Sequence, residues 1–246
     1  LITILMNPFM SCSARMPVYA LFAGVFFAEN QGLIVFSLYL LGIVMAILLA
    51  FILKVTKFKN SESVFIMELP EYRLPVFKNL LLHTWDKGKG FLRKAGTIIF
   101  SMAVLIWFLS NFSFQGMVDI DQSFLAAFGS FIAPIFKPLG FGDWQASVAL
   151  LTGFMAKEVV VSTMIVIYGT GESITALSQM IQGSFSALTA YAYMVFVLLY
   201  IPCLATVAVV KKETASWKWT FFSIGYSLGI AWLIAFVIYQ VGKLFI

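Results

Sequence analysis

The sequence predicts an all-α membrane protein: a polytopic transmembrane helical bundle of about seven spans, with broken helices and one amphipathic helix on the cytoplasmic surface. Of its 246 residues, 61% are hydrophobic and only 11% are charged, and the mean hydropathy is +0.97. Soluble domains carry about 25% charged residues. Apolar runs recur along the whole chain, each near the roughly 20 residues that a helix needs to cross a hydrocarbon core. Prolines interrupt several of these runs, which predicts the helix breaks.

The predicted crossings cover residues 1–28, 33–53, 95–112, 122–139, 145–168, 190–210 and 219–242. The fourth is the weakest, because Pro134, Lys137 and Pro138 predict a discontinuous element. If residue 1 is cytoplasmic, thirteen Lys and Arg residues, Lys137 among them, face the cytoplasm, and only Lys243 faces the other side. This positive-inside pattern predicts a multi-pass protein whose N-terminal end and loop 54–94 are cytoplasmic.

The crossings divide the chain into four parts. We expect two spans in 1–53, a cytoplasmic loop in 54–94, central spans with a broken helix in 95–168, and two further spans in 169–246. Within the loop, apolar side chains share one face of residues 76–87, which predicts a helix lying on the membrane surface. Gly88 and Gly90 are expected to turn the chain into the next span, and "MELPEYRLP" (67–75) has turn character. His83, the only histidine, lies on this surface helix and is interpreted as an interfacial residue rather than a ligand.

Several function classes are disfavoured. The net charge of +5 and pI of about 9.2 relate to membrane topology rather than to nucleic acid. The sequence has no G-x-x-x-x-G-K-[ST] phosphate loop, and two distant cysteines give neither a disulfide framework nor zinc spacing. An intramembrane cysteine enzyme needs a base beside its nucleophile, and His83 is predicted to lie far from both thiols. The start at Leu1, with no visible signal peptide, predicts a piece of a longer protein.

Polar residues interrupt the first crossing in "MSCSARMPVY" (10–19). Pro8 precedes this segment and Pro17 closes its polar part, and each proline removes a backbone donor and opposes the helix. The break falls near the middle of the bilayer, where free backbone groups are tolerated only if protein or a water-filled cavity satisfies them. The side chains expected to face this polar interior are Ser11, Cys12, Ser13 and Arg15.

Two other crossings carry similar features. In "AKEVVVST" (156–163), Lys157 and Glu158 each cost about 2.5–3.5 kcal/mol in hydrocarbon by insertion scales. On a continuous helix they point about 100° apart, so each is expected to need its own partner. In "YIPCLAT" (200–206), Pro202 and Cys203 repeat the proline–cysteine pairing. Broken helices at mid-depth form ion and substrate sites in many transporters.

The residue types fit two kinds of ligand. Two thiols, several hydroxyls and one carboxylate suit Fe, Zn or Cu better than Mg or Ca. Arg15 and Lys157 instead favour an anionic substrate, together with the N-termini of half-helices. Arg15 is also suited to hold Cys12 as a thiolate, to pair with Glu158, or to clamp a neighbouring carboxylate or carbonyl. A purely structural interpretation stays open as well: the cysteines pack, the prolines kink helices, and Lys157 and Glu158 form salt bridges.

Five motifs occur in one order along the chain: "PFMSCSARMPVYALF", "MELPEYRLP", "KGFLRKAGTIIF", "WQASVALLTGFMAKEVVVST" and "LLYIPCLAT". Together they resemble the ferrous iron transport protein B (FeoB) family over nearly the whole sequence. Members of that family are bacterial inner-membrane proteins that import Fe²⁺, with a cytosolic G domain, a helical spacer and a membrane region containing two gate segments. The resemblance implies that 1–53 belongs to the first gate and 169–246 to the second.

The resemblance also implies roles for the singled-out residues. Cys12 and Cys203 are the expected pore thiols, and with Glu158 they are the expected metal ligands, supported by Ser11 and Ser13. Fe²⁺ is the transported ion, whereas GTP and Mg²⁺ act only through an N-terminal G domain that this sequence lacks. The implied partners are the lipid bilayer, that G domain with the first membrane half, and small accessory iron-transport proteins. A homo-oligomer is compatible with the sequence, and nucleic acid is not expected.

The leading hypothesis is therefore the permease portion of a GTP-linked Fe²⁺ uptake transporter in the bacterial inner membrane. This region is not expected to be an enzyme. Two alternatives remain: a gate-type transporter of nucleosides or other polar or anionic solutes, and a truncated membrane subunit that does not transport.

Overall fold

The computed structural model describes residues 2–57, 76–114, 116–168 and 174–245, so the motif at 67–75 lies outside the described residues. The α-helices are α1 Ile2–Met6, α2 Met16–Phe26, α3 Gln31–Thr56, α4 Phe77–Asn111, α5 Phe124–Phe136, α6 Trp144–Met155, α7 Val159–Ile167, α8 Ile174–Ser184, α9 Ala187–Leu199, α10 Leu204–Thr214 and α11 Trp217–Phe245. Short 3-10 helices cover Asn7–Phe9 (η1), Ser13–Arg15 (η2), Ile120–Gln122 (η3) and Lys137–Leu139 (η4). Strands β1 Phe112–Ser113 and β2 Gly116–Met117 form one small antiparallel pair. The predicted all-α membrane bundle is confirmed.

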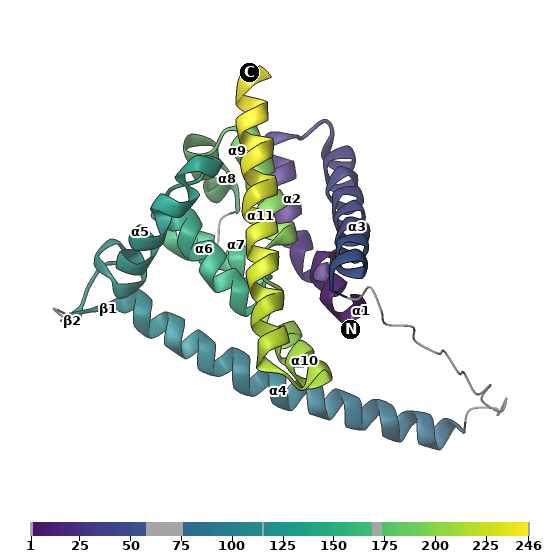
Figure 1. Ribbon diagram of the computed structural model, residues 1–246. Helices are drawn as coiled ribbons and strands as arrows, with labels where there is room; N and C mark the ends of the chain where they lie inside the picture. The colour runs from purple at the N-terminus through teal and green to yellow at the C-terminus, as the bar shows by residue number, and fades with distance from the viewer. Residues whose placement is uncertain (1, 58–75, 115, 169–173, 246) are drawn as a thin grey trace.

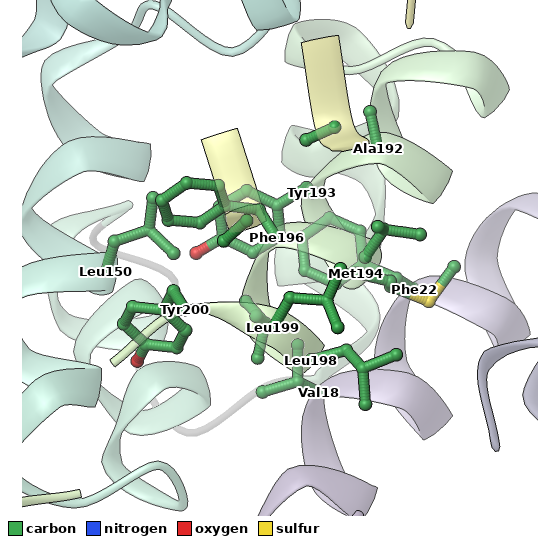
Figure 2. Close-up of a cluster of buried hydrophobic side chains, with 14 of the residues drawn as sticks. Val18, Phe22, Leu150, Ala192, Tyr193, Met194, Phe196, Leu198, Leu199 and Tyr200 are labelled. Carbon is green, nitrogen blue, oxygen red and sulfur yellow. The ribbon is translucent and has the colours of Figure 1, made fainter. Parts of the chain in front are cut away.

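Helix α9 forms the centre of the bundle (Figure 1). Ten of its thirteen residues are buried, as expected for a helix that is apolar on every side. It packs against α11, α2 and α3. Figure 2 shows its side chains reaching Leu150 of α6 on one side and Val18 and Phe22 of α2 on the other. The Tyr193 ring lies 5.0 Å from that of Phe22, so aromatic contacts join the N-terminal helices to α9.

Four segments are long and apolar enough to cross a membrane: Ile2–Phe26, Gln31–Thr56, Ala187–Thr214 and Trp217–Phe245. They coincide with the first, second, sixth and seventh predicted crossings. A fifth arises if Phe124–Leu139 and Trp144–Met155 together make one span, although this pair is bent by 101°. These segments, found among the described residues, make the chain a multi-pass membrane protein. The total of seven crossings stays a prediction.

Helix α4 differs from the expectation. Residues 76–87 and 95–112 were assigned to a surface helix and a separate crossing, yet one 35-residue helix contains nearly all of both. The predicted turn at Gly88 and Gly90 is wrong, because a glycine inside a helix costs only about 1 kcal/mol and strong helix formers surround both. In Figure 1, α4 runs along one end of the bundle, crosswise to α11.

The broken element around Pro134 is present, with a geometry that the sequence did not indicate. Trp232 of α11 donates from its indole nitrogen to the carbonyl of Ile135 (3.0 Å), and Gln240 donates to the carbonyl of Pro138 (2.9 Å). The η4 turn therefore lies against the C-terminal half of α11. Lys137 lies toward the same end of α11 as Lys243, whereas a straight fourth crossing would separate these lysines across the bundle.

Candidate functional site

The first crossing is broken where the sequence predicted it. Helix α1 ends at Met6, Met10 and Cys12 have extended backbone, and α2 begins at Met16 with Pro17 in its first turn. Proline is favoured in that turn because its missing N–H would have no helical acceptor there. The extended residues leave several carbonyl groups without helical donors.

Side chains satisfy these carbonyls. Arg15 is only 2% exposed, and its guanidinium donates to the carbonyl oxygens of Met10 (2.7 Å) and Pro8 (2.8 Å). The Tyr226 hydroxyl of α11 donates to the carbonyl of Leu5. Of the partners considered for Arg15, the structure therefore shows the neighbouring carbonyls. This arrangement meets the requirement that backbone groups at membrane depth find protein partners.

A second break separates α6 from α7 and contains Lys157 and Glu158. Ala156 is extended, and a Cβ on Gly153 would collide with the side chain of Val160, so the chain turns back sharply between the two helices. The expectation that Lys157 and Glu158 lie on one continuous helix is wrong. The turn separates them: Lys157 is 2% exposed, whereas Glu158 is exposed.

The buried Lys157 reaches the end of α9. Its ammonium donates to the carbonyl of Val197 at 3.3 Å and lies 4.5 Å from the centre of the Tyr200 ring. In a longer helix the amide of Ile201 would bond to the Val197 carbonyl. Tyr200 is extended and ends the helix before that bond forms, which leaves this oxygen available to the ammonium.

The third break runs from Tyr200 to Cys203. Pro202 cannot donate a backbone hydrogen bond, and α10 restarts after Cys203, which is its N-cap residue. The Cys203 Sγ lies 3.3 Å from Thr206 Oγ1. The thiol therefore stands at the N-terminal end of a new helix, where backbone N–H groups stabilise negative charge.

The three breaks lie close together. Lys157 interacts electrostatically with Arg15 and with both thiols, Cys12 and Cys203, and Tyr200 interacts with the same three groups. Residues predicted from three separate crossings thus lie within electrostatic range of Lys157. Cys12 is exposed and Cys203 partly buried, so both thiols keep some open surface.

The remaining predicted residues are placed less centrally. Ser11 lies beside Tyr19, but no hydrogen bond of normal geometry joins the two hydroxyls. Ser13 and Glu158 are exposed. Among the described residues, no three His, Cys, Asp or Glu side chains come together as a metal-binding group. The assignment of Cys12, Cys203 and Glu158 as metal ligands stays a prediction.

The site contains two buried cations, Arg15 and Lys157. Arg15 bonds to two carbonyls and Lys157 to one, and neither pairs with a carboxylate of the part of the chain that the structure describes. Buried charges are normally paired. Among the described residues, the site therefore holds two cations whose partners are carbonyl oxygens, the ring of Tyr200 and nearby thiols rather than carboxylates.

Sequence reasoning missed two groups of this site. Tyr200 supplies the ring beneath Lys157, and its place directly before "IPC" was the available signal, since a side chain beside a proline break lies near any site there. The Val197 carbonyl supplies the acceptor, and no residue type in the sequence indicates which carbonyl a helix end leaves free.

Comparisons with known proteins find two matching family models and several relatives. The Gate family model, described as "Nucleoside recognition", matches residues 92–217, and the model described as "Ferrous iron transport protein B C terminus" matches residues 35–87. An Fe(2+) transporter FeoB of Staphylococcus aureus (strain COL) is 55% identical over all of this chain and 37% of its own length. No solved structure matches the chain.

More distant relatives carry related names. An Fe(2+) transporter FeoB of Methanocaldococcus jannaschii is 44% identical over 99% of the chain and 37% of its own length. A fusion of Fe(2+) transport protein A with FeoB in Porphyromonas gingivalis is 41% identical over all of the chain and 35% of its own length. The chain therefore spans little more than a third of the length of each of these relatives.

Proposed function

Because the chain belongs to the FeoB family, as its C-terminal gate region, we propose that it is the membrane permease portion of a ferrous iron uptake transporter. The observation that carries this proposal is that Cys12 and Cys203, at two helix breaks, both lie within electrostatic range of Lys157 in a third break. Relatives named as Fe(2+) transporters support the cargo.

The chemistry of the site suits a borderline divalent ion. Thiolate sulfur binds Fe²⁺ more readily than it binds Mg²⁺ or Ca²⁺. Broken helices expose carbonyl oxygens that can replace part of the hydration shell of an ion, as in other transporters. We propose that Cys12 and Cys203 meet the ion in turn, and that Ser11, Ser13 and Glu158 form its polar approach.

Energy coupling and partners belong to the same proposal. We propose that GTP hydrolysis, with Mg²⁺, occurs in a G domain outside this chain and gates the pore, so that this region is not itself an enzyme. The relative fused to Fe(2+) transport protein A favours a small accessory protein as a partner. We place the protein in the bacterial inner membrane with the N-terminal end and residues 54–94 in the cytoplasm.

The test is anaerobic uptake of labelled Fe²⁺ by the full-length transporter in cells that lack other iron importers. Replacing Cys12 and Cys203 together by serine is expected to reduce uptake at least tenfold, because the hydroxyl is a far weaker ligand than the thiolate. Met16→Leu is the matched control, since it removes an exposed sulfur from the same break without removing a thiol. Uptake that is unchanged in the double variant would contradict the proposal.

One observation favours a second candidate. Arg15 and Lys157 are buried cations that bond to carbonyls, and such a pair suits an anionic or polar organic solute. The description of the Gate model as nucleoside recognition agrees with this. Uptake of a labelled nucleoside or nucleotide that is indifferent to added Fe²⁺ would favour this candidate. A protein that moves neither cargo would favour a non-transporting subunit.

A further inference from the structure

The surroundings of the Lys157 ammonium resemble a cation site. It lies against the carbonyl oxygen of Val197, over the ring of Tyr200, and within electrostatic range of Cys12 and Cys203. A carbonyl, an aromatic face and two sulfur atoms are all groups that attract positive charge. The ammonium thus contacts a carbonyl oxygen and an aromatic face, with the two thiols within electrostatic range, and these groups together favour a cation.

Lys157 is poorly satisfied there for a structural residue. Of its three N–H donors, one has an acceptor among the described residues, at the long distance of 3.3 Å. The nearby Arg15 guanidinium repels it. A lysine kept only for stability would be expected to have a carboxylate partner, because an isolated charge is costly in the interior.

Arg15 differs from Lys157 in how firmly it is held. Two short hydrogen bonds, of 2.7 and 2.8 Å, fix the planar guanidinium to the first break. Lys157 lies in a turn. Its ammonium is carried by a flexible four-carbon side chain, which can move the charge by several ångströms without any backbone change. Arg15 is therefore held by two short hydrogen bonds, whereas Lys157 is held by one long hydrogen bond and an aromatic ring.

We propose that the Lys157 ammonium is a tethered cation that fills the transport site in the unloaded protein and is displaced by the entering divalent ion. This inference rests on the proposed function. Without the displacement, a divalent ion between the two thiols would face two fixed positive charges. With it, the arriving ion takes over the carbonyl, the ring and the sulfur atoms that Lys157 leaves. Lys157 then opposes entry of any cation that binds the thiols too weakly to displace it.

The first test does not use iron. In the full-length protein, mass spectrometry gives the rates at which Cys12 and Cys203 react with a cationic trimethylammonium methanethiosulfonate and with neutral methyl methanethiosulfonate. Lys157→Gln keeps a donor for Val197 but removes the charge. It is expected to raise the cationic-to-neutral rate ratio at both thiols roughly tenfold, the effect of one charge several ångströms away. Lys211→Gln is the matched control, since Lys211 also lies over an aromatic ring, that of Trp217 at 4.2 Å, but on α10 at the end of the bundle.

The second test is anaerobic Fe²⁺ binding to the same variants. Lys157→Gln is expected to tighten binding roughly tenfold, whereas Lys157→Arg and Lys211→Gln keep the wild-type affinity or weaken it. An unchanged rate ratio in Lys157→Gln, with normal thermal unfolding, would overturn the inference. If the rate ratio rises in Lys157→Gln but no variant binds Fe²⁺, the ammonium does occupy the site, and the proposal that Fe²⁺ is the transported ion is wrong. The two tests therefore separate failure of this inference from failure of the proposed function.

Discussion

Lys157 and Val197 are forty positions apart in the sequence, and the ammonium of one donates to the carbonyl oxygen of the other over 3.3 Å. The donor lies in the break between α6 and α7, and the acceptor lies in the last turn of α9. The α6–α7 break thus supplies the donor for a carbonyl that the end of α9 leaves without a helical partner, and α9 supplies an acceptor for the buried ammonium. We therefore expect a substitution at either break to affect the other.

Gly153 gives the sharpest test of this coupling. A Cβ at this position would lie 2.5 Å from the hydroxyl oxygen of Tyr200 and would also collide with Val160. Both neighbours are buried and have little room to move. Gly153→Ala is expected to lower the free energy of unfolding by about 1–3 kcal/mol, the usual cost of overpacking, measured by thermal unfolding in detergent.

The control for this prediction lies in α11. A Cβ on Gly229 would meet nothing within 4 Å, so Gly229→Ala is expected to leave the melting temperature unchanged or to raise it slightly. Equal shifts in the two variants would show that Tyr200 does not lie against Gly153.

Arg15 is expected to hold the first break in shape. Arg15→Lys keeps the charge but loses the fork that bonds to the Pro8 and Met10 carbonyls together. Because hydrogen bonds to charged groups contribute about 1.5–3 kcal/mol, we expect a loss of stability in this range. Alkylation of Cys12 should also become several times faster. The exposed Arg93 of α4 is the matched control, and Arg93→Lys should change neither quantity.

Close packing of α3 against the same break gives a third prediction. A Cβ on Gly42 would lie 2.7 Å from the carbonyl oxygen of Phe9. Backbone yields less readily than a side chain, so Gly42→Ala should push α3 away from the break and lower the melting temperature by several degrees. Gly32, in the same helix, has nothing within 4 Å of such a Cβ, and Gly32→Ala should unfold like the wild type.

The helix breaks differ in how well the sequence indicated them. Pro8, Pro17 and Pro202 remove backbone donors, so the breaks beside Cys12 and Cys203 could be predicted from local chemistry. The break at Ala156–Glu158 contains three good helix formers, and local preference therefore predicts a continuous helix. Its bend is a tertiary effect, since the partners of Lys157 come from the end of α9.

The sequence predicted the charged residues of the site but not the partners that they bind. Arg15 and Lys157 were singled out because charge in an apolar run is costly, and that reasoning holds wherever their partners lie. The partners themselves are backbone oxygens of Met10, Pro8 and Val197. Which carbonyls become free depends on where each helix ends, and this emerges only in the folded chain.

The last prediction compares a partly buried tyrosine, Tyr226, with the fully buried Tyr193. The Tyr226 hydroxyl donates to the Leu5 carbonyl, whereas the buried Tyr193 hydroxyl has no hydrogen-bond partner among the described residues. Tyr226→Phe leaves a buried acceptor unpaired, which costs about 1–3 kcal/mol. Tyr193→Phe removes an unpaired polar group and should be neutral or stabilising. Thermal unfolding of both variants in detergent measures the difference, and a larger loss in Tyr193→Phe would contradict the role of α11 in capping α1.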